Sequence, residues 1–593
     1  YVSVKGNFMN DNKKFIEVMI KDSYRLIPMK LSEIPSACSF SEEAQKEVMY
    51  YDMYNYKTID HISSMKRSEL NYYIFKFDKN SHLPNKDKKN LKETFYKNLL
   101  EWGCQNKDKT YDLLKYSMIY CEQDCRVLKK GLQKWYELFK EVDQRIDVYE
   151  FFSLPSLANH YFRINKCFDG CYEMSGSLGK FFNNFVSGGR VCSRYNKKFK
   201  VEKKIQDFDA VSLYPSAMHL FQGYLKGIPK RIDTTDYNVL KQYDGFFVKV
   251  KIKEVNKKQP IPVLNYMNKT TQTKTWTNKL KDKIVYLDKV GLEDAIEFQD
   301  IEFEIIDGYY YNDGFNTTVK ESIKHLFNKR LEAKKNKNDS LQLIFKLLMN
   351  SSYGKLIQKT PETDIKYMKQ QDLMKYVSKN YHHIKNWIDI RDSTYLRMET
   401  HKSLDDSFSS PHLGCQVLSY SKRLMNRVIC TANDNNMMIY YTDTDSIHID
   451  EEAVEPLSKL YEEKYKTQLI GKNLGQFHCD FDFKGMKDVR SVGLIVLGKK
   501  CYIDKLEGTC DKGKKHNTYH IRLKGVSTDA IDNYCNTRKM EDETYNEWKL
   551  YEDLYEGKSI TFDLNVNNKV RFEKSKSQEY ATFSGDFRRT IKF

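Results

Sequence analysis

The segment that most constrains the fold is 437–450, MMIYYTDTDSIHID, in which two short apolar stretches flank an acidic turn. Runs rich in isoleucine and tyrosine on both sides of a turn predict a β-hairpin. Asp443 and Asp445 are two positions apart, so on a strand they would point to the same face. Two carboxylates this close repel each other unless a cation lies between them. The hairpin therefore predicts a cation site at its tip.

A second candidate site is the segment IQDFDAVSLYP, 205–215, where an alternating strand pattern changes to a helical one. Pro215 is tolerated there because the first turn of a helix does not need its N–H group. A carboxylate at this junction, Asp209, can hold a divalent metal while nearby backbone N–H groups face a triphosphate. Taken alone, Asp209 could equally be a helix cap.

The third feature is a helical hairpin, predicted over 319–335 and 340–356 with an N-terminal cap at Asp339 or Ser340. Lys346, Asn350 and Tyr353 follow at i, i+4 and i+7, so they share one helical face. A lysine there can neutralise phosphate, and an aromatic ring can pack on a base or sugar. Taken alone, the hairpin could be merely a solvated basic surface.

Length and composition agree with a nucleic-acid partner. A chain of 593 residues is too long for one core, so we expect several α/β domains. Lysine and arginine total 98 against 81 acidic residues, and the surplus of +17 favours a polyanionic partner. Thirteen cysteines without a CxxC pair indicate free thiols in a reducing compartment. No apolar run reaches the about 18 residues that span a membrane.

In this order, DxxSLYP, KxxxNSxYG and YxDTDS resemble the A, B and C motifs of family B DNA polymerases. Lys500-Cys501-Tyr502 resembles the KxY element at the primer end, YCEQD resembles the third exonuclease motif, and FVSGGR resembles the YxGG linking segment. Segments 226–320 and 358–408 resemble the two terminal-protein-region insertions of the protein-primed branch. We expect segment 226–320 to consist of short strands and turns, and segment 358–408 to be polar and irregular.

This resemblance implies a right-hand polymerase fold (palm, fingers and thumb) with a partial RNase H-like 3′–5′ exonuclease domain. The implied domains are 1–150, exonuclease-like; 151–205, linker and start of the palm; 206–225, palm with motif A; 226–320, first insertion; 321–357, fingers with motif B; 358–408, second insertion; 409–540, palm with motif C and KxY; and 541–593, thumb.

The resemblance also implies roles for individual residues. Asp209 and Asp445 would bridge two Mg²⁺ ions, for which Mn²⁺ could substitute, with Asp443 and the Ala210 backbone in support. The implied dNTP-binding residues are Ser212, Leu213, Tyr214, Arg330, Lys334, Lys346, Asn350 and Tyr353. The implied primer- and template-binding residues are Gly188, Gly189, Arg190, Gly354, Lys500 and Tyr502, the last two on one strand face.

The implied partners are primer–template DNA, dNTPs and a terminal priming protein, with no membrane. We expect a soluble monomer inside the host cell of a virus or linear mobile element.

Two departures from the family pattern concern proofreading. Val186 stands where the linking motif normally has tyrosine. No first or second exonuclease motif precedes the third, and the chain begins at Tyr1 in a strand-like stretch, so we expect an upstream part to be missing. Tyr120 and Asp124 of the third motif are also an ordinary i, i+4 pair on a helix. Because exonucleolysis needs several carboxylates, we predict that this chain does not proofread.

Three other interpretations of these residues are possible. A reverse transcriptase or RNA-dependent polymerase typically has adjacent aspartates in its third motif, whereas Thr444 separates them here. A glycosyltransferase with a DxD site would leave the KxxxNSxYG helix unexplained. The alternative from a different class is a catalytically inactive, DNA-binding relic of a polymerase.

Overall fold

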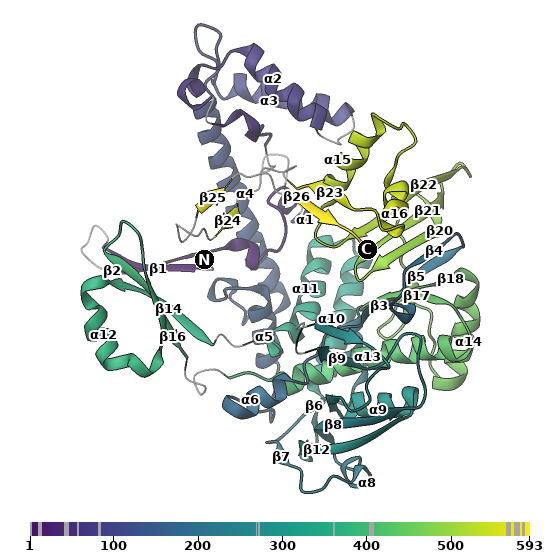
Figure 1. Ribbon diagram of the computed structural model, residues 1–593. Coiled ribbons are helices and arrows are strands. Elements are labelled where there is room, and N and C mark those ends of the chain that lie inside the picture. Colours follow the sequence, from purple (N-terminus) through teal and green to yellow (C-terminus); the bar gives the residue numbers. More distant parts are fainter. Residues whose placement is uncertain are drawn as a thin grey trace. The chain divides into compact units, whose positions relative to one another are not determined.

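The computed structural model shows a mixed α/β chain that divides into two compact units (Figure 1). The first unit combines residues 1–161 with 325–351, and the second combines 162–324 with 352–593. The structure describes residues 3–9, 15–38, 40, 47–55, 58–80, 85–268, 270, 273–359, 362–402, 408–564, 571–573, 581–583 and 588–593.

The first unit is mainly helical. Its elements are a hairpin of β1 (Ser3–Met9) and β2 (Phe15–Lys21), and the helices α1 (Ile34–Ala37), α2 (Arg67–Asn80), α3 (Asn85–Glu101), α4 (Leu113–Val142) and α5 (Leu154–Ile164), the last of which runs into the second unit. Asp112 caps α4 by accepting a hydrogen bond of 3.0 Å from the Lys115 backbone N–H. Tyr116 and Tyr120 of α4 pack with Phe95 of α3 in one buried core.

The predicted helical hairpin is confirmed as α10 (Thr318–Lys335) and α11 (Asp339–Leu356), within one residue of the expected ends. The predicted cap was wrong by one residue, because the side chain of Asn338 accepts the hydrogen bond of the Leu341 backbone N–H at 3.1 Å. Ile344 and Leu348 of α11 are fully buried, whereas Lys346 is exposed. The helix is therefore amphipathic, as its spacing predicted.

The second unit is built around a nine-stranded antiparallel sheet. Its strand order is β22-β21-β20-β5-β18-β17-β3, with β19 also pairing with β5 and β4 with β20. The strands are β3 (Val191–Ser193), β4 (Phe199–Val201), β5 (Ile205–Ala210), β17 (Ile439–Asp443), β18 (Ser446–Asp450), β19 (Phe477–Cys479), β20 (Lys487–Gly498), β21 (Cys501–Thr509) and β22 (Lys515–Leu523). β20, β21 and β22 lie side by side in the yellow-green part of Figure 1.

Burial fixes the register of this sheet. All five residues of β18 are buried, and Ile205 and Phe208 of the neighbouring β5 are fully buried. A slip by one residue would exchange the two faces of a strand, so packing on this scale permits one register. The helices of the same unit that flank these strands in sequence are α6 (Gly176–Asn183), α7 (Leu213–Leu220), α13 (Pro411–Asp434) and α14 (Val454–Tyr465).

The segment 226–320 contains a sheet of its own, in the order β11-β8-β12-β7. Its elements are β7 (Lys230–Arg231), α8 (Tyr237–Leu240), β8 (Gly245–Val255), β9 (Asn265–Asn268), β10 (Thr273–Trp276), β11 (Ile284–Asp288), α9 (Lys289–Gln299), β12 (Ile301–Tyr311) and β13 (Phe315–Asn316), which pairs with β6 (Tyr224–Leu225). Strands and turns were predicted here, but β8 and β12 have 11 residues each and are not short, and the helix α9 was not predicted.

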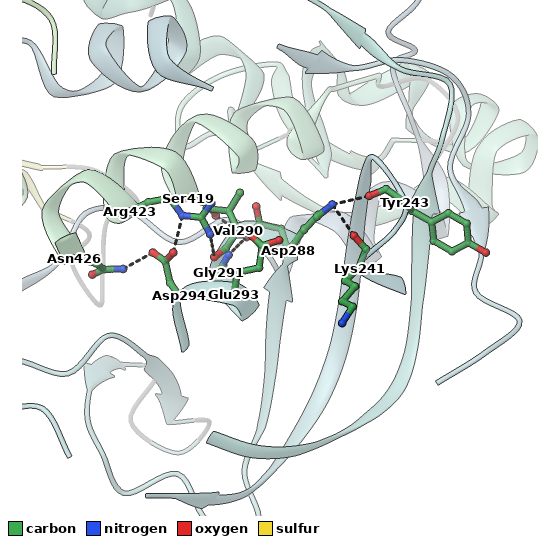
Figure 2. Close-up of polar contacts among 11 residues, drawn as sticks. Lys241, Tyr243, Asp288, Val290, Gly291, Glu293, Asp294, Ser419, Arg423 and Asn426 are labelled. Carbon is green, nitrogen blue, oxygen red and sulfur yellow. Dashed lines mark hydrogen bonds and ion pairs between the residues drawn. The ribbon is translucent and has the colours of Figure 1, made fainter. Parts of the chain in front are cut away.

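Polar and charged side chains connect segment 226–320 to α13, as Figure 2 shows. Arg423 of α13 donates to the carboxylate of Asp294 at 2.6 Å and to that of Glu293 at 2.8 Å. Asn426 donates to the other oxygen of Asp294 at 2.7 Å, and Ser419 donates to Asp288 at 2.7 Å. Because Asp294 and Asp288 are buried, this network holds α9 firmly on α13.

The expectation that 358–408 is irregular was wrong. Its described part forms a three-stranded sheet of β14 (Thr363–Lys369), β16 (Tyr395–His401) and β15 (Ile384–Asp389), in this spatial order. The helix α12 (Leu373–Asn380) lies between β14 and β15 in sequence. Leu396, Met398 and Thr400 alternate along β16 and are buried, whereas most residues of its partner strands are exposed. Polar side chains on the outer strands concealed this period of two.

The C-terminal part consists of two helices and two pairs of short strands. It comprises α15 (Thr528–Lys539), α16 (Glu547–Tyr555), β23 (Ile560–Asp563) paired with β26 (Arg588–Ile591), and β24 (Arg571–Glu573) paired with β25 (Ala581–Phe583). Tyr551 and Leu550 of α16 and Phe562 of β23 share a core with Ile503 of β21.

Candidate active site

The predicted carboxylates of motifs A and C meet where β5 pairs with β18. Asp209 lies opposite Ser446 in the antiparallel register, and the Ala210 backbone N–H donates to the Asp445 carbonyl at 2.9 Å. This pairing places Asp445, one residue before β18, beside the end of β5. Two segments more than 200 residues apart in sequence therefore form one acidic site.

The sequence pattern had placed Asp445 on a strand, but in the structure this residue is not on one. β17 ends at Asp443 and β18 begins at Ser446, so Thr444 and Asp445 form the turn of the hairpin. The turn is tight: the Asp445 backbone N–H donates to the Asp443 carbonyl at 2.8 Å, and Thr444 has a φ of 68°. A β-branched residue rarely adopts a positive φ, and such strain persists only where the surrounding structure enforces it.

The surrounding structure here is the FVSGGR segment. The Thr444 backbone N–H donates to the Arg190 carbonyl at 2.8 Å, and a Cβ atom on Gly189 would lie 2.5 Å from the Thr444 methyl carbon. Gly188, by contrast, has no atom within 4 Å of its Cβ position. Gly189 thus lets the segment pack directly behind the acidic turn.

The two carboxylates disfavour each other's charged form. Burial raises the pKa of Asp209 to about 8, and the neighbouring Asp445 carboxylate adds to the shift. Burial likewise raises the pKa of Asp445, to which Asp443 and Asp207 contribute. A divalent cation between Asp209 and Asp445 would relieve this repulsion, and carboxylate oxygens are the ligands that Mg²⁺ prefers. The donor set therefore fits a magnesium site, although no group of three metal-ligating side chains gathers among the described residues.

Asp443 makes a different set of contacts. Lys500 donates to its two carboxylate oxygens at 2.7 and 2.9 Å, and the Tyr441 hydroxyl donates to one of them at 3.2 Å. The Lys500 backbone N–H in turn donates to the Tyr441 hydroxyl at 2.8 Å. Asp443 is thus neutralised by a lysine, which is the geometry expected of a supporting carboxylate. Tyr441, which the sequence analysis had not singled out as a site residue, connects the two motifs.

Lys500 and Tyr502 do not share a strand face as expected. Lys500 lies in the turn before β21, with a φ of 58°, and is exposed, whereas Tyr502 is on the strand and only 5% exposed. The Tyr502 ring packs 4.9 Å from that of Tyr441. Both residues of the KxY element therefore contact motif C, one through its charge and one through its ring.

Motif A continues into α7. Ser212 precedes the helix with a φ of 47°, and Leu213 begins it in a buried position. The Tyr214 ring stacks on Tyr353 of α11, with centroids 4.1 Å apart and planes 26° apart. Burial and the neighbouring Tyr353 hydroxyl raise the pKa of Tyr214. Motifs A and B thus present one stacked tyrosine pair, followed on α11 by the half-buried Gly354.

Arg190 takes a structural position. It is 3% exposed, its guanidinium donates to the Pro262 carbonyl at 2.8 Å, and it lies over the Trp276 ring at 5.6 Å. Burial lowers its pKa. The Arg190 side chain therefore contacts segment 226–320. That Arg190 also contacts DNA stays a prediction.

The remaining expected nucleotide ligands, Arg330, Lys334, Lys346 and Asn350, belong to the first unit. Lys346 and Asn350 are exposed on α11, and burial lowers the pKa of Arg330. That these four residues bind the triphosphate stays a prediction.

The exonuclease-like pair also lies in the first unit. Tyr120 is buried on α4, and its hydroxyl forms a hydrogen bond of 2.8 Å with that of Tyr51. Asp124 lies one turn later and is half-buried.

Within the described part of the chain, no helix is long and apolar enough to cross a membrane.

Comparison with known proteins places this geometry in a family. A family model described as "DNA polymerase type B, organellar and viral" matches residues 4–433, which include motifs A and B. A DNA polymerase of Kluyveromyces lactis is 24% identical over 551 residues, covering 89% of this chain and 50% of that protein. A probable DNA polymerase of Agaricus bitorquis is 23% identical over 514 residues, covering 83% and 59%. The chain thus spans between 50% and 59% of these relatives' length.

Solved structures of Phi29 DNA polymerase share the fold. Its complex with primer–template DNA aligns with a TM-score of 0.60 at 14% identity, over 100% of this chain and 82% of that one. Its complex with primer–template DNA and incoming nucleotides aligns with a TM-score of 0.56 at 14% identity, again over 100% and 82%. The family match covers well over half of the chain, and the chain therefore belongs to the organellar and viral type B DNA polymerases.

Proposed function

We propose that this protein is a template-directed DNA polymerase that extends a 3′-hydroxyl with dNTPs by two-metal phosphoryl transfer. The observation that carries the proposal is the pairing of β5 with β18, which brings Asp209 and Asp445 together at one end of two central strands of the sheet. Family membership and the fold shared with Phi29 DNA polymerase support it.

In this proposal Asp209 and Asp445, with the Ala210 backbone, hold two Mg²⁺ ions. The ions, when bound, would lower the pKa of the primer 3′-hydroxyl and neutralise charge on the triphosphate. Asp443 does not need to bind metal directly, because Lys500 already neutralises it. Its role is to hold Lys500 beside the acidic turn, where the ammonium group can meet the phosphate of the primer end.

The stacked tyrosines define the nucleotide site. Tyr214 lies under the sugar of the incoming nucleotide and is supported from behind by Tyr353, so it cannot swing away from a 2′-hydroxyl. We propose that this rigidity selects deoxynucleotides. Arg330 and Lys346, with Lys334 and Asn350, bind the triphosphate from the helical hairpin.

The finer architecture follows the same proposal. The palm comprises 206–225 and 409–540, the fingers 321–357 and the thumb 541–593, with a partial exonuclease-like domain at 1–150 joined through 151–205. The insertions at 226–320 and 358–408 serve the terminal priming protein and the downstream strand. We propose DNA replication of a viral or linear mobile genome, by a monomer primed by a protein.

Proofreading is absent from this proposal. The Tyr120 hydroxyl forms a hydrogen bond with that of Tyr51, and the part of the first unit that the structure describes contains no group of three or more His, Cys, Asp or Glu side chains that could hold a metal ion. We expect no shortening of a mismatched primer in Mg²⁺, and such shortening would contradict this part of the proposal.

The direct test is extension of a labelled primer–template with dNTPs or rNTPs by three proteins: the wild type, Asp445→Asn, and Asp482→Asn as a control that replaces an exposed aspartate. We expect the wild type and the control to extend with dNTPs only and Asp445→Asn to be inactive. If none of the three extends while all bind DNA, the inactive relic replaces the polymerase.

A further inference from the structure

A closed cluster of charged side chains lies on the same face of the sheet as Asp209. It consists of Asp207 on β5, His448 on β18, Asp504 on β21 and His520 on β22. His448 is paired directly with Asp207 in the antiparallel register, two residues along from the pair of Ser446 and Asp209. The cluster is thus the next layer behind the acidic turn.

His448 is the centre of the cluster. Its Nε2 lies 3.2 Å from Asp504 Oδ2, and its Nδ1 lies 3.7 Å from Asp207 Oδ1. His448 and Asp504 are both 0% exposed. The desolvation cost of a charged pair buried to this extent can exceed the attraction between its charges, so the pair is weak evidence for stability alone.

The cluster keeps its histidine charged. Burial alone would lower the pKa of His448, but the Asp504 and Asp207 carboxylates outweigh burial and raise it to about 9, with a smaller contribution from Asp443. In return, burial would raise the pKa of Asp504, but His448 and then His520 lower it. Near neutral pH, His448 is therefore an imidazolium held between two carboxylates.

The tyrosine of the KxY element rests on this imidazolium. The Tyr502 ring lies 5.1 Å from the His448 ring, at an interplanar angle of 71°. Tyr441 packs against His448 at 5.8 Å, and Phe481 closes a further side at 5.8 Å. Any movement of His448 would thus be transmitted to Tyr502 and, through Tyr441, to the contacts of Asp443 and Lys500.

We propose that His448 is a positioning residue, which ties β21, the strand of the primer-end tyrosine, to β5 and β18, the strands of the metal carboxylates. It sets the distance between the primer 3′-hydroxyl and the acidic site without touching substrate. This inference rests on the proposed polymerase function and adds to it a determinant of catalytic alignment. The contacts of His448 with Asp207 of β5 and Asp504 of β21 support it, because they link two strands that are not neighbours in the sheet.

The test replaces His448→Gln, alone and together with Asp504→Asn. Glutamine can place a donor near the position of Nε2 but leaves two carboxylates without their cation. We expect the single variant to lose kcat for primer extension by about 10- to 100-fold, the order of loss for a misplacement of about 1 Å, with KM for dNTP and DNA affinity unchanged. The double variant restores a neutral hydrogen-bonded pair across β18 and β21, and we expect it to recover most of kcat.

His516→Gln is the matched control. His516 lies on the same strand as His520, β22, but four residues earlier, and it pairs with Gly508 in the register, outside the cluster. We expect its kcat to stay at the wild-type value.

A second measurement reads alignment without catalysis. A 2-aminopurine at the primer 3′ position, in the absence of dNTPs, should change its fluorescence in His448→Gln but not in His516→Gln. Wild-type kcat in His448→Gln would overturn the inference, as would a loss of kcat that matches the loss of folded protein in thermal melts. If the wild type itself does not extend primers, the proposed function fails, and the 2-aminopurine signal alone decides the positioning role: an unchanged signal refutes it.

Discussion

Replacing Gly189 with alanine would test how rigidly the acidic turn is held. The new Cβ atom would lie 2.5 Å from Thr444 Cγ2 and 3.0 Å from its Cβ and Oγ1, whereas ordinary contacts begin at 3.4 Å. Thr444 cannot simply withdraw, because its backbone N–H donates to the Arg190 carbonyl and its φ is already 68°. The turn that carries Asp445 must therefore shift by roughly 1 Å, the difference between these distances.

The expected effect on activity exceeds the effect on stability. Forcing one methyl group into a packed site costs about 1–3 kcal/mol of unfolding free energy. A shift of about 1 Å in a group that aligns the reaction can lower the rate by about 100-fold. We therefore expect Gly189→Ala to remain folded but to extend primers about 100-fold more slowly than the wild type, by the same argument.

Gly188→Ala is the control, because its Cβ would meet no atom within 4 Å and its φ is not positive. Urea unfolding followed by circular dichroism measures stability, and single-nucleotide extension measures kcat. If Gly189→Ala and Gly188→Ala extended primers at the same rate, the reasoning that Gly189 supports the acidic turn would be refuted.

Three further predictions follow from the charges of the second unit. Asp209→Asn removes a half-buried carboxylate that Asp445 repels, so we expect a higher melting temperature than the wild type in EDTA and no further rise with Mg²⁺, measured by thermal denaturation. The pKa of His448 is raised from its ordinary 6.5 to about 9, so its stabilising contribution is complete below about 6.5 and lost as pH rises through about 9. The stability difference between wild type and His448→Gln should shrink over that window in urea titrations. Arg423→Met leaves Asp294 buried without its cation and should cost about 3–5 kcal/mol of unfolding free energy, whereas Lys257→Met at a surface pair should cost about 0–1 kcal/mol.

The sequence predicted the elements whose signals are local. The hairpin at 437–450 and the helical pair α10–α11 were predicted because alternation, helical spacing and capping residues lie within each segment. The order of the three motifs indicated the family, and the comparison with known proteins confirmed it. The sheet at 363–401 was missed because only its middle strand alternates between buried and exposed residues.

The details of the candidate site depended on contacts that no single segment encodes. The spacing suggested that Asp443 and Asp445 act together. In the structure the tight turn separates them, so that Asp443 pairs with Lys500 and Asp445 lies beside Asp209. Likewise nothing local marked His448, because its partners come from β5 and β21.

The sequence by itself determined which residues can carry the chemistry, namely three aspartates, a lysine and two tyrosines in a fixed order. Only the tertiary structure decided how they are used. The physical reason is that the charge state and position of a side chain depend on burial and on partners across neighbouring strands, and strand register is set by packing of the whole sheet. The same packing that buries β18 brings Asp209 to Asp445 and encloses His448 between two carboxylates.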